Sequence, residues 1–496
     1  MEKRLPSVFA CKEVDELQKY IDYLLNFKNV FKNFSYTLCY QVLALILPII
    51  TVPYITRVLD QQLVGLNSVI QANCSYFELI GMLGISLLGP REIAKCLGDK
   101  EKLSNTFFSI YQIQFAMHSI VLIVYGVYAG IFMKQGLAFF YLIYLFAYMF
   151  DISWLFIGLE DFKSVTVRNV FIRLVGFFLL ITCVKKNSDI YIYVLTLYIP
   201  QIIMNVYMWY IALEKYVYYK QIRVLNKFYL KEAISLLIPQ IASSVYTMLD
   251  KTVLGIFCTY TTAAIYAQGQ TLLQLFYAVV PSFCKVMSPR IANCIKRNSQ
   301  KEIYKYMRMS CHVVSFISCG LFWGVLVCAK TFVGWYLPQD YSQVADVLLI
   351  CSPIIIMVSG ANYISVEYLI PLGEQNKYTK SIIIAAILNL ILNFALAPKF
   401  GIYGVCVGSV VAETIGFFIQ LFYAKQYIDL KRIFAGTQNY LIAGIGMYLV
   451  LKKITCYTES SFGGIIILVL IGMIIYTAFV LLCKKTSRLF KYKLKS

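Results

Sequence analysis

Residues 64–89 read VGLNSVIQANCSYFELIGMLGISLLG, and this stretch decides the fold class. A run of this length, almost all apolar, can cross the roughly 30 Å hydrocarbon layer of a bilayer as a helix. Four polar residues recur in it at helical spacing and share one face: Asn67, Gln71, Ser75 and Glu78. Because polar side chains are costly in lipid, that face has to meet protein or water. The stretch therefore predicts a membrane helix with one hydrophilic face.

Similar stretches fill the rest of the 496-residue chain. It is 60% hydrophobic with a mean hydropathy of +0.70, and only 14% of its residues are charged, against about a quarter in soluble domains. We place fourteen stretches near residues 33–54, 64–89, 105–133, 137–157, 166–184, 190–213, 232–257, 263–288, 307–331, 343–370, 380–397, 401–424, 439–454 and 463–483. The sequence predicts an all-α polytopic membrane protein with about 14 transmembrane helices, and excludes a secreted enzyme with a single anchor.

The net charge of +20 reports topology and not nucleic-acid binding. Most lysines and arginines lie in the short connections on one side of the predicted spans, and the positive-inside rule assigns that side to the cytoplasm. With an even number of spans, both termini are expected in the cytoplasm. Residues 1–32 lack the apolar core of a signal peptide and predict a cytoplasmic amphipathic leader, although an ordinary helical extension explains them equally well.

A repeat divides the predicted helices into two sets. GISLLGPREIAK (84–95) and KVMSPRIANCIKR (285–297) each end a span with Pro-Arg before a basic turn, six spans apart. This predicts two pseudo-symmetric six-helix lobes in parallel orientation, an arrangement that transporters use with the substrate path between the halves. The expected domains are a leader, an N-lobe, a cytoplasmic linker, a C-lobe, and two final spans with a basic cytoplasmic tail: 1–32, 33–213, 214–231, 232–424 and 425–496.

Polar residues also line one face of the two spans that follow the linker. We expect these faces and the face of residues 64–89 to converge on a hydrated cleft between the lobes, where cations at different depths suit an anionic head group. Helix-to-helix hydrogen bonding is the alternative. The predicted substrate-binding residues are Arg57, Gln71, Glu78, Gln240, Thr247, Lys251, Gln270, Gln274 and Lys285.

Ionisable residues inside the spans are candidates for ion coupling or for charge pairing. They are Glu78, Asp250, Arg173 and Glu367. We expect no cofactor and no bound metal, but coupling to protons, sodium or the membrane potential stays open. No G-x-x-x-x-G-K-[ST] motif occurs, so ATP binding through a Walker loop is not expected.

Six blocks resemble the polysaccharide-repeat-unit flippases of the Wzx type, within the multidrug, oligosaccharidyl-lipid and polysaccharide exporter superfamily. The blocks keep the family's order over most of the chain. They are PYITRVLDQQLVG (53–65), GISLLGPREIAK (84–95), WLFIGLEDFKSVTVRN (154–169), IPQIASSVYTMLDKTVLGIF (238–257), YLIPLGEQNKYTKS (368–381) and ILNLILNFALAPKFGIYGVCVGSVVAE (387–413).

The resemblance implies a non-enzymatic flippase in a bacterial cytoplasmic membrane. It would move undecaprenyl-pyrophosphate-linked oligosaccharide from the inner to the outer leaflet by alternating access, for capsule or another surface polysaccharide. Implied partners are the lipid-linked oligosaccharide, membrane lipids, a polysaccharide polymerase and glycosyltransferases, and no nucleic acid. The family's cavity between the lobes is cationic; Arg57 and Lys251 match its blocks, whereas Lys285 and Glu78 come from periodicity alone.

Three alternatives stay open at this point. A peptidoglycan-precursor flippase and a proton- or sodium-coupled drug exporter belong to the same superfamily. A membrane polymerase or ligase acting on the same lipid belongs to a different class of protein, and it would change the mass of the lipid-linked sugar.

Overall fold

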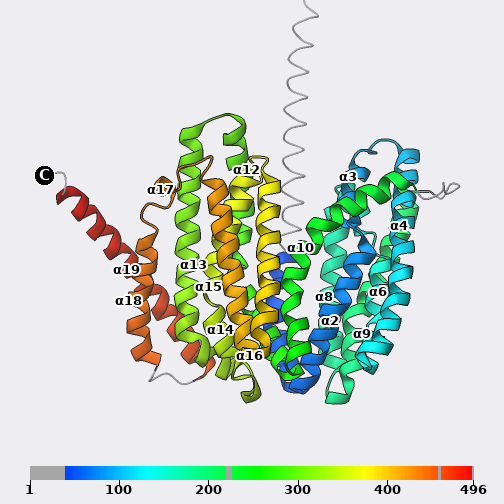
Figure 1. Cartoon of the computed structure of the whole chain (residues 1–496), viewed down its shortest axis with the longest axis horizontal. Helices are drawn as coiled ribbons and strands as arrows, with labels where there is room; N and C mark the ends of the chain where they lie inside the picture. The colour runs from blue at the N-terminus through cyan, green and yellow to red at the C-terminus, as the bar shows by residue number, and fades with distance from the viewer. Residues whose placement is uncertain (1–39, 219–225, 456–459, 494–496) are drawn as a thin grey trace, which may run out of the picture.

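The computed structural model describes residues 40–218, 226–455 and 460–493, which form helices with no β-strand among them (Figure 1). The predicted leader 1–32 lies outside the described residues, as does the middle of the predicted linker 214–231. The predicted all-α membrane fold is confirmed for the described part of the chain.

The first bundle stands at the right of Figure 1 and holds the helices that precede residue 218. They are the helix Tyr40–Val58, α2 (Gln61–Met82), α3 (Ile85–Ala94), α4 (Lys100–Tyr128) with the π-turn η1 (Ala129–Met133), α5 (Gly136–Phe140), α6 (Leu142–Met149), α7 (Ser153–Gly158), α8 (Phe162–Cys183), η2 (Asn187–Asp189), and α9 (Ile190–Ile211) with η3 (Ala212–Tyr216).

The second bundle follows and lies beside the first (Figure 1). Its helices are α10 (Lys227–Phe257), α11 (Tyr260–Tyr277), α12 (Val279–Lys296), α13 (Gln300–Tyr336), η4 (Gln339–Tyr341), α14 (Val344–Cys351), α15 (Pro353–Ile364) with η5 (Ser365–Leu369), α16 (Gln375–Ala424) and α17 (Leu430–Ile433). The last two helices, α18 (Gln438–Thr455) and α19 (Phe462–Lys493), pack on α13.

Helix α16 is a hairpin of two antiparallel halves. Gly401 has φ 57° and ψ −133°, a conformation that requires glycine, and it reverses the chain. Residues at equal distances from this turn approach one another: Gly404 lies against Leu396, and Gly408 lies against Asn393. The two halves correspond to the predicted spans 380–397 and 401–424.

Ten helices in the described ranges are long and apolar enough to cross a membrane, or eleven if the bent pair Gln339–Cys351 and Pro353–Leu369 is one span. This criterion counts the α16 hairpin once and does not admit α10 or α18. The predicted count of 14 is therefore not confirmed, and the predicted lobe boundaries stay a prediction.

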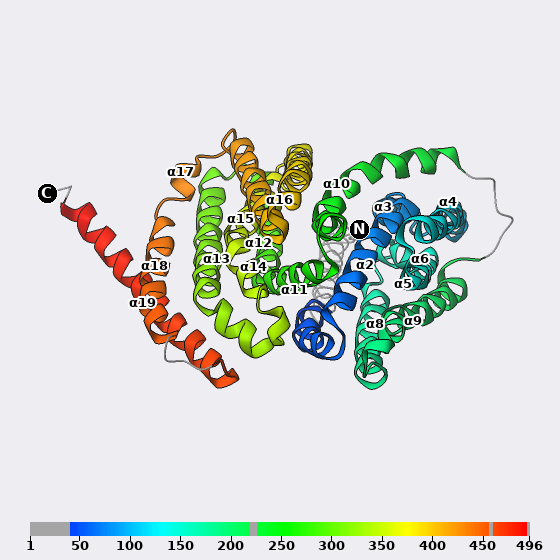
Figure 2. The same cartoon turned by 60° about the horizontal axis from the view of Figure 1, so that its bottom comes forward.

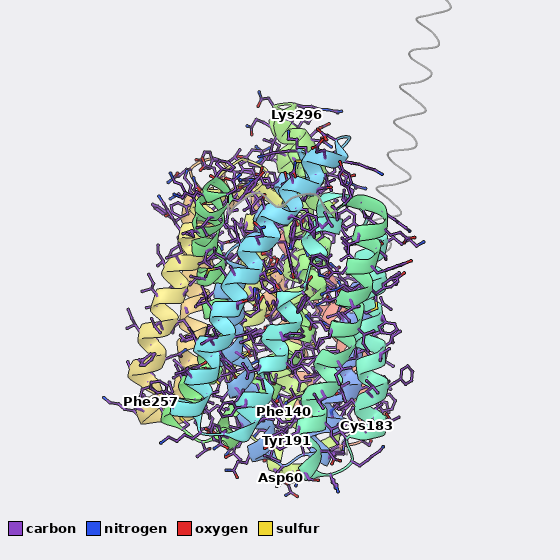
Figure 3. All side chains as sticks on the ribbon, turned by 90° about the vertical axis from the view of Figure 1, so that its right-hand side faces the viewer. Asp60, Phe140, Cys183, Tyr191, Phe257 and Lys296 are labelled. Atoms are coloured by element: carbon purple, nitrogen blue, oxygen red, sulfur yellow. The ribbon has the colours of Figure 1, made fainter. Side chains whose placement is uncertain are left out.

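The apolar core joins the two bundles at one end of the molecule and not at the other. Figure 3 labels these ends by Asp60 and by Lys296, and we call them the Asp60 end and the Lys296 end. Toward the Asp60 end a single buried cluster includes Val64 of α2 and Tyr266 of α11. Toward the Lys296 end the buried residues form two clusters. One surrounds Trp154 in the first bundle and includes Ala233 from the first half of α10, and the other surrounds Met307 in the second bundle.

Side chains near the Lys296 end are correspondingly exposed. Ile80, on the side of α2 that faces the second bundle, is 42% exposed, and Val286 of α12 is 49% exposed. In Figure 1 the two bundles diverge toward the top, where the Lys296 end lies. The bundles are therefore closed against each other at the Asp60 end. At the Lys296 end the first half of α10 packs on the first bundle, where Glu232 pairs with Arg91 at 2.7 Å, while the cluster around Met307 stays separate from the first bundle.

Candidate functional site

The polar face of α2 turns into the first bundle, not toward the second. Asn67 accepts a hydrogen bond from the Tyr141 hydroxyl at 2.8 Å, and the Ser75 hydroxyl lies 3.3 Å from the Tyr144 hydroxyl. The prediction that this face converges with its partners between the bundles is thus wrong. Periodicity identifies which residues share a face, but the neighbour that the face meets depends on how the helices pack.

The opposite face of α2 meets the second bundle. A Cβ atom at Gly65 would lie 1.6 Å from the Tyr260 carbonyl oxygen of α11, so only glycine permits this crossing. Further along α2, polar side chains continue the contact with the second bundle. Asn73 Oδ1 accepts a hydrogen bond from Thr252 Oγ1 of α10 at 2.9 Å. The interface between the bundles therefore contains polar groups, though not the ones predicted.

The predicted Gln71 lines a cavity of about 340 Å³ inside the first bundle. Arg173 lies at this cavity too, and its guanidinium sits 5.5 Å from the centre of the Tyr40 ring. Arg173 does not neutralise any of the predicted acids in this arrangement.

A different arginine, Arg168, also lines the first-bundle cavity and pairs with an acid outside the predicted set. Arg168 Nη2 lies 2.5 Å from Asp151 Oδ2, and both side chains are only 8% exposed. Asn205 Oδ1 accepts two further hydrogen bonds from Arg168, at 3.1 and 2.9 Å. Because Asp151 sits in the break between α6 and α7, this buried network fixes the shape of a discontinuous span.

Arg168 and Asp151 are absent from the predicted site residues. Arg168 lies just inside the predicted stretch 166–184 and is the last residue but one of the block 154–169 quoted above. An arginine at the third position of an apolar stretch was the available signal for a buried partner.

The second bundle holds a smaller cavity of about 70 Å³, large enough for a few water molecules. The predicted Gln270 and Gln274 line it together with Tyr277, from one face of α11. Asp250 of α10 and Glu413 of α16 line it as well. The two cavities thus differ in charge. Two arginines and one carboxylate, Asp151, line the first, whereas two carboxylates and, among the described residues, no lysine or arginine line the second.

Hydroxyl and amide groups surround the Asp250 carboxylate, which is 3% exposed. Its Oδ2 accepts hydrogen bonds from Tyr266 and, at 3.0 Å, from Ser409, and its Oδ1 accepts one from Asn393 Nδ2 at 2.6 Å. Asn389 Oδ1 lies 3.1 Å from the same Asn393 nitrogen.

Asn393 Oδ1 is buried and has no hydrogen-bond partner among the described residues. A buried oxygen without a donor is unusual and needs an explanation. The two asparagines stand four residues apart in an otherwise apolar stretch, and this spacing was a signal that the prediction did not use.

Lys251 lies between the two bundles. Its neighbour Asp250 faces α11 and α16, and its other neighbour, Thr252, bonds to α2. At 100° per residue, Lys251 falls between these directions. Among the described residues no hydrogen-bond or ion-pair partner is found for its ammonium group, which is only partly exposed.

The remaining predicted residues on α10 are less informative. Gln240 donates a hydrogen bond to Ser86 of the first bundle, so it does bridge the bundles. The side chain of Thr247 lies outside the described residues.

Three other predicted residues lie apart from both cavities. Arg57 donates hydrogen bonds to the Tyr336 and Pro53 carbonyl oxygens at the Asp60 end. Lys285 is exposed on α12. Glu367 is fully buried in η5, where Oε1 accepts a 2.6 Å hydrogen bond from Ser310.

Glu78 is half-buried on the same α2 face as Gln71 and therefore points into the first bundle. The described residues contain no cluster of three or more histidine, cysteine, aspartate or glutamate side chains that could hold a metal ion.

Residues 30–295 match the family described as "Polysaccharide biosynthesis protein". The chain is 24% identical over 376 residues to a putative O-antigen transporter of Shigella dysenteriae, covering 74% of this chain and 93% of that protein. It is 22% identical over 410 residues to a putative O-antigen transporter of Escherichia coli, covering 79% and 96%.

Among solved structures, the fold is similar to that of the lipid II flippase MurJ in an inward closed conformation. The TM-score is 0.72, the sequences are 15% identical, and the match covers 94% of this chain and all of that one. At this identity the likeness concerns the fold alone.

Proposed function

This chain belongs to the polysaccharide biosynthesis protein family, and from that premise we propose that it moves undecaprenyl-pyrophosphate-linked oligosaccharide across a bacterial cytoplasmic membrane. The putative O-antigen transporters that it resembles along most of their length support a polysaccharide flippase. The lipid carrier, the repeat unit and a role in capsule or other surface polysaccharide are the finer parts of the proposal.

The observation that carries the proposal is the closure of the bundles at one end only. A transporter that alternates its access has to be sealed on one side while it is open on the other. The shared core around Val64 and Tyr266 supplies the seal, and the separate cores at the Lys296 end leave the other side open.

The charge distribution supports a cytoplasmic Lys296 end. Lys95, Lys296 and Arg297 follow the two Pro-Arg repeats there, and the positive-inside rule places such connections in the cytoplasm. The open side would then receive cargo from the inner leaflet, where lipid-linked repeat units are assembled according to the family resemblance.

Polar groups between the bundles would replace water around the head group of the cargo. Each unpaired polar group costs several kcal/mol in hydrocarbon, so a pyrophosphate with sugars cannot cross unaided. Lys285 and Gln274 are exposed, and Lys251 is only partly exposed. We assign the pyrophosphate contact to Lys251, while the polyprenyl tail stays in lipid.

Two sources of energy are compatible with this arrangement. With the inside negative, outward movement of an anion is favoured by about 2.3 kcal/mol per charge per 100 mV. The second source is an ion bound at Asp250, which the sequence already marked as a coupling candidate.

The residues around Asp250 fit a sodium ion. Hard cations prefer oxygen ligands, and Asp250, Asn389, Asn393 and Ser409 offer carboxylate, amide and hydroxyl oxygens within one cluster. A cation would also satisfy Asn393 Oδ1, the buried oxygen without a donor. The ion would supply positive charge to Asp250, and its binding would bias the second bundle toward one packing.

Thermal unfolding of the purified chain in sodium chloride and in potassium chloride tests this assignment. Sodium is expected to raise the midpoint for the wild type but not for Asp250→Asn or Asn393→Leu. Glu367→Gln is the matched control and should keep the response, because Glu367 lies outside the cluster. A sodium response that persists in Asp250→Asn would show that sodium binds at another site. Transport that depends on pH and not on sodium would identify the coupled ion as a proton.

Reconstitution into liposomes tests the function itself. A labelled lipid-linked oligosaccharide should appear in the opposite leaflet with unchanged mass. A change in mass would make the chain an enzyme. Transport of the peptidoglycan precursor or of a cationic drug in preference to the oligosaccharide would favour one of the rival exporters.

A further inference from the structure

A second pair of cavities lies away from the interface between the bundles. Figure 2 shows α18 and α19 on the far side of α13 from α2 and α11. One cavity, of about 1030 Å³, is bounded by α13, the connection from α17 to α18, α18 and α19. Among the described residues that line it, none comes from the first bundle, α10 or α11, so this cavity lies off the proposed transport path.

This cavity has a basic, hydrogen-bonding mouth. Arg308, two turns from the start of α13, and His312, one turn further, lie on one side. Gln438 and Asn439 lie on the other, and Tyr440 places its hydroxyl 3.1 Å from His312 Nδ1. No aspartate or glutamate lines the cavity among the described residues.

An apolar cavity continues from it into the membrane zone. It measures about 560 Å³ and shares Phe316, Ile317 and Thr477 with the basic one. Glycines widen it, and a Cβ atom at Gly324 would meet no atom within 4 Å. Together the two cavities form an amphiphilic groove, with a cationic end at the Lys296 end of the molecule and an apolar end within the helices.

We propose that this groove binds an anionic glycerophospholipid from the leaflet at the Lys296 end. The phosphodiester is bound by Arg308, with His312 and the two amides as further partners, and an acyl chain fills the apolar cavity beside Gly324. Basic pockets between membrane helices bind anionic head groups in this way, attracted by the negative surface of the cytoplasmic leaflet.

A single phosphodiester suits this mouth better than the cargo does. A pyrophosphate with several sugars needs many polar partners, whereas Met309, Val313, Val480 and Leu481 make much of the lining apolar. The bound lipid fills the space between α13 and the pair α18–α19, and so it fastens that pair to the second bundle.

Native mass spectrometry of the detergent-purified full chain tests the proposal. It is titrated with phosphatidylglycerol and with phosphatidylcholine of identical acyl chains. We expect one retained phosphatidylglycerol and little phosphatidylcholine. Arg308→Glu should weaken the adduct about fivefold or more, as expected for loss of one cation near a lipid phosphate. Gly324→Trp should also weaken it by filling the apolar cavity.

Matched controls separate this result from general effects. Lys163→Glu makes the same charge change at an exposed position of the first bundle, and Gly126→Trp adds the same side chain where a Cβ atom also meets nothing. Both controls should retain the lipid. Equal binding of the two phospholipids, an adduct unaffected by Arg308→Glu, or displacement by a stoichiometric amount of undecaprenyl phosphate would each overturn the proposal, the last by assigning the groove to the cargo.

Discussion

Arg57 and Tyr336 bond to each other's helices across the two bundles. Arg57 Nη2 donates to the Tyr336 carbonyl oxygen at 3.1 Å, and the Tyr336 hydroxyl donates to the Ile49 carbonyl oxygen at 2.8 Å. Gln61 Nε2 adds a 2.9 Å bond to the Asp340 carbonyl oxygen. Side chains from both bundles thus hold the Asp60 end closed by bonding to main-chain oxygens.

Arg57→Ala should weaken this closure. A hydrogen bond contributes about 1 kcal/mol, so its loss should raise the open fraction of the Asp60 end several-fold. The rate at which a cysteine introduced at the buried Leu59 reacts with a water-soluble thiol reagent measures that fraction. Lys134→Ala, another exposed cation, should leave the rate unchanged. Equal rates in wild type and Arg57→Ala would remove Arg57 from the closure.

Gly65→Ala should prevent the crossing of α2 and α11. The added Cβ would lie 1.6 Å from the Tyr260 carbonyl oxygen, which is main chain and cannot rotate away. Transport is expected to fall strongly, and a cysteine introduced at Leu59 is expected to react faster with the water-soluble thiol reagent. Gly126→Ala adds the same methyl group where nothing lies within 4 Å, and it should be neutral. Normal transport by Gly65→Ala would contradict the close crossing.

Arg168→Ala should destabilise the first bundle, because it leaves Asp151 buried without its cation. Removing one partner of a buried ion pair costs about 3–5 kcal/mol. Thermal unfolding in detergent should show a large drop in midpoint. The double variant Arg168→Met with Asp151→Leu should regain most of the loss, since no charge is then left unpaired. A double variant no more stable than Arg168→Ala would argue against the pair as the cause.

Lys251→Ala should lower transport at least about tenfold, because a hydrogen bond to a charged group contributes about 1.5–3 kcal/mol. Membrane insertion and thermal stability should stay near wild type, since no described residue bonds to this ammonium group. Lys251→Arg keeps the charge and should keep part of the activity. Full transport by the alanine variant would exclude Lys251 as the pyrophosphate contact.

The sequence allowed the helical membrane fold to be predicted, because runs such as 64–89 have few other stable states in a cell. It also identified the hairpin at Gly401 as two spans, and it grouped Gln270 with Gln274 on one face. It did not reveal which neighbour the α2 face meets. That depends on a crossing at Gly65, whose tightness is a property of two helices together.

Buried pairs from distant segments escaped prediction for the same reason. Arg168 of α8 and Asp151, in the break between α6 and α7, lie 17 residues apart with α7 between them. Asp250 and Asn393 lie 143 residues apart and meet only when α10 packs on α16. Helical periodicity carries no information about such separations.

Binding of cargo is proposed to close the Lys296 end of the two bundles and to open the Asp60 end. Spin labels at Ile80 and Val286 report the Lys296 end, and labels at Asp60 and Gln339 report the Asp60 end. Pulsed dipolar distances in liposomes should shorten at the first pair and lengthen at the second when undecaprenyl-pyrophosphate-linked oligosaccharide is added, but not when undecaprenol is added. Distances that stay fixed at both ends during transport, or that change in the same direction, would contradict the account.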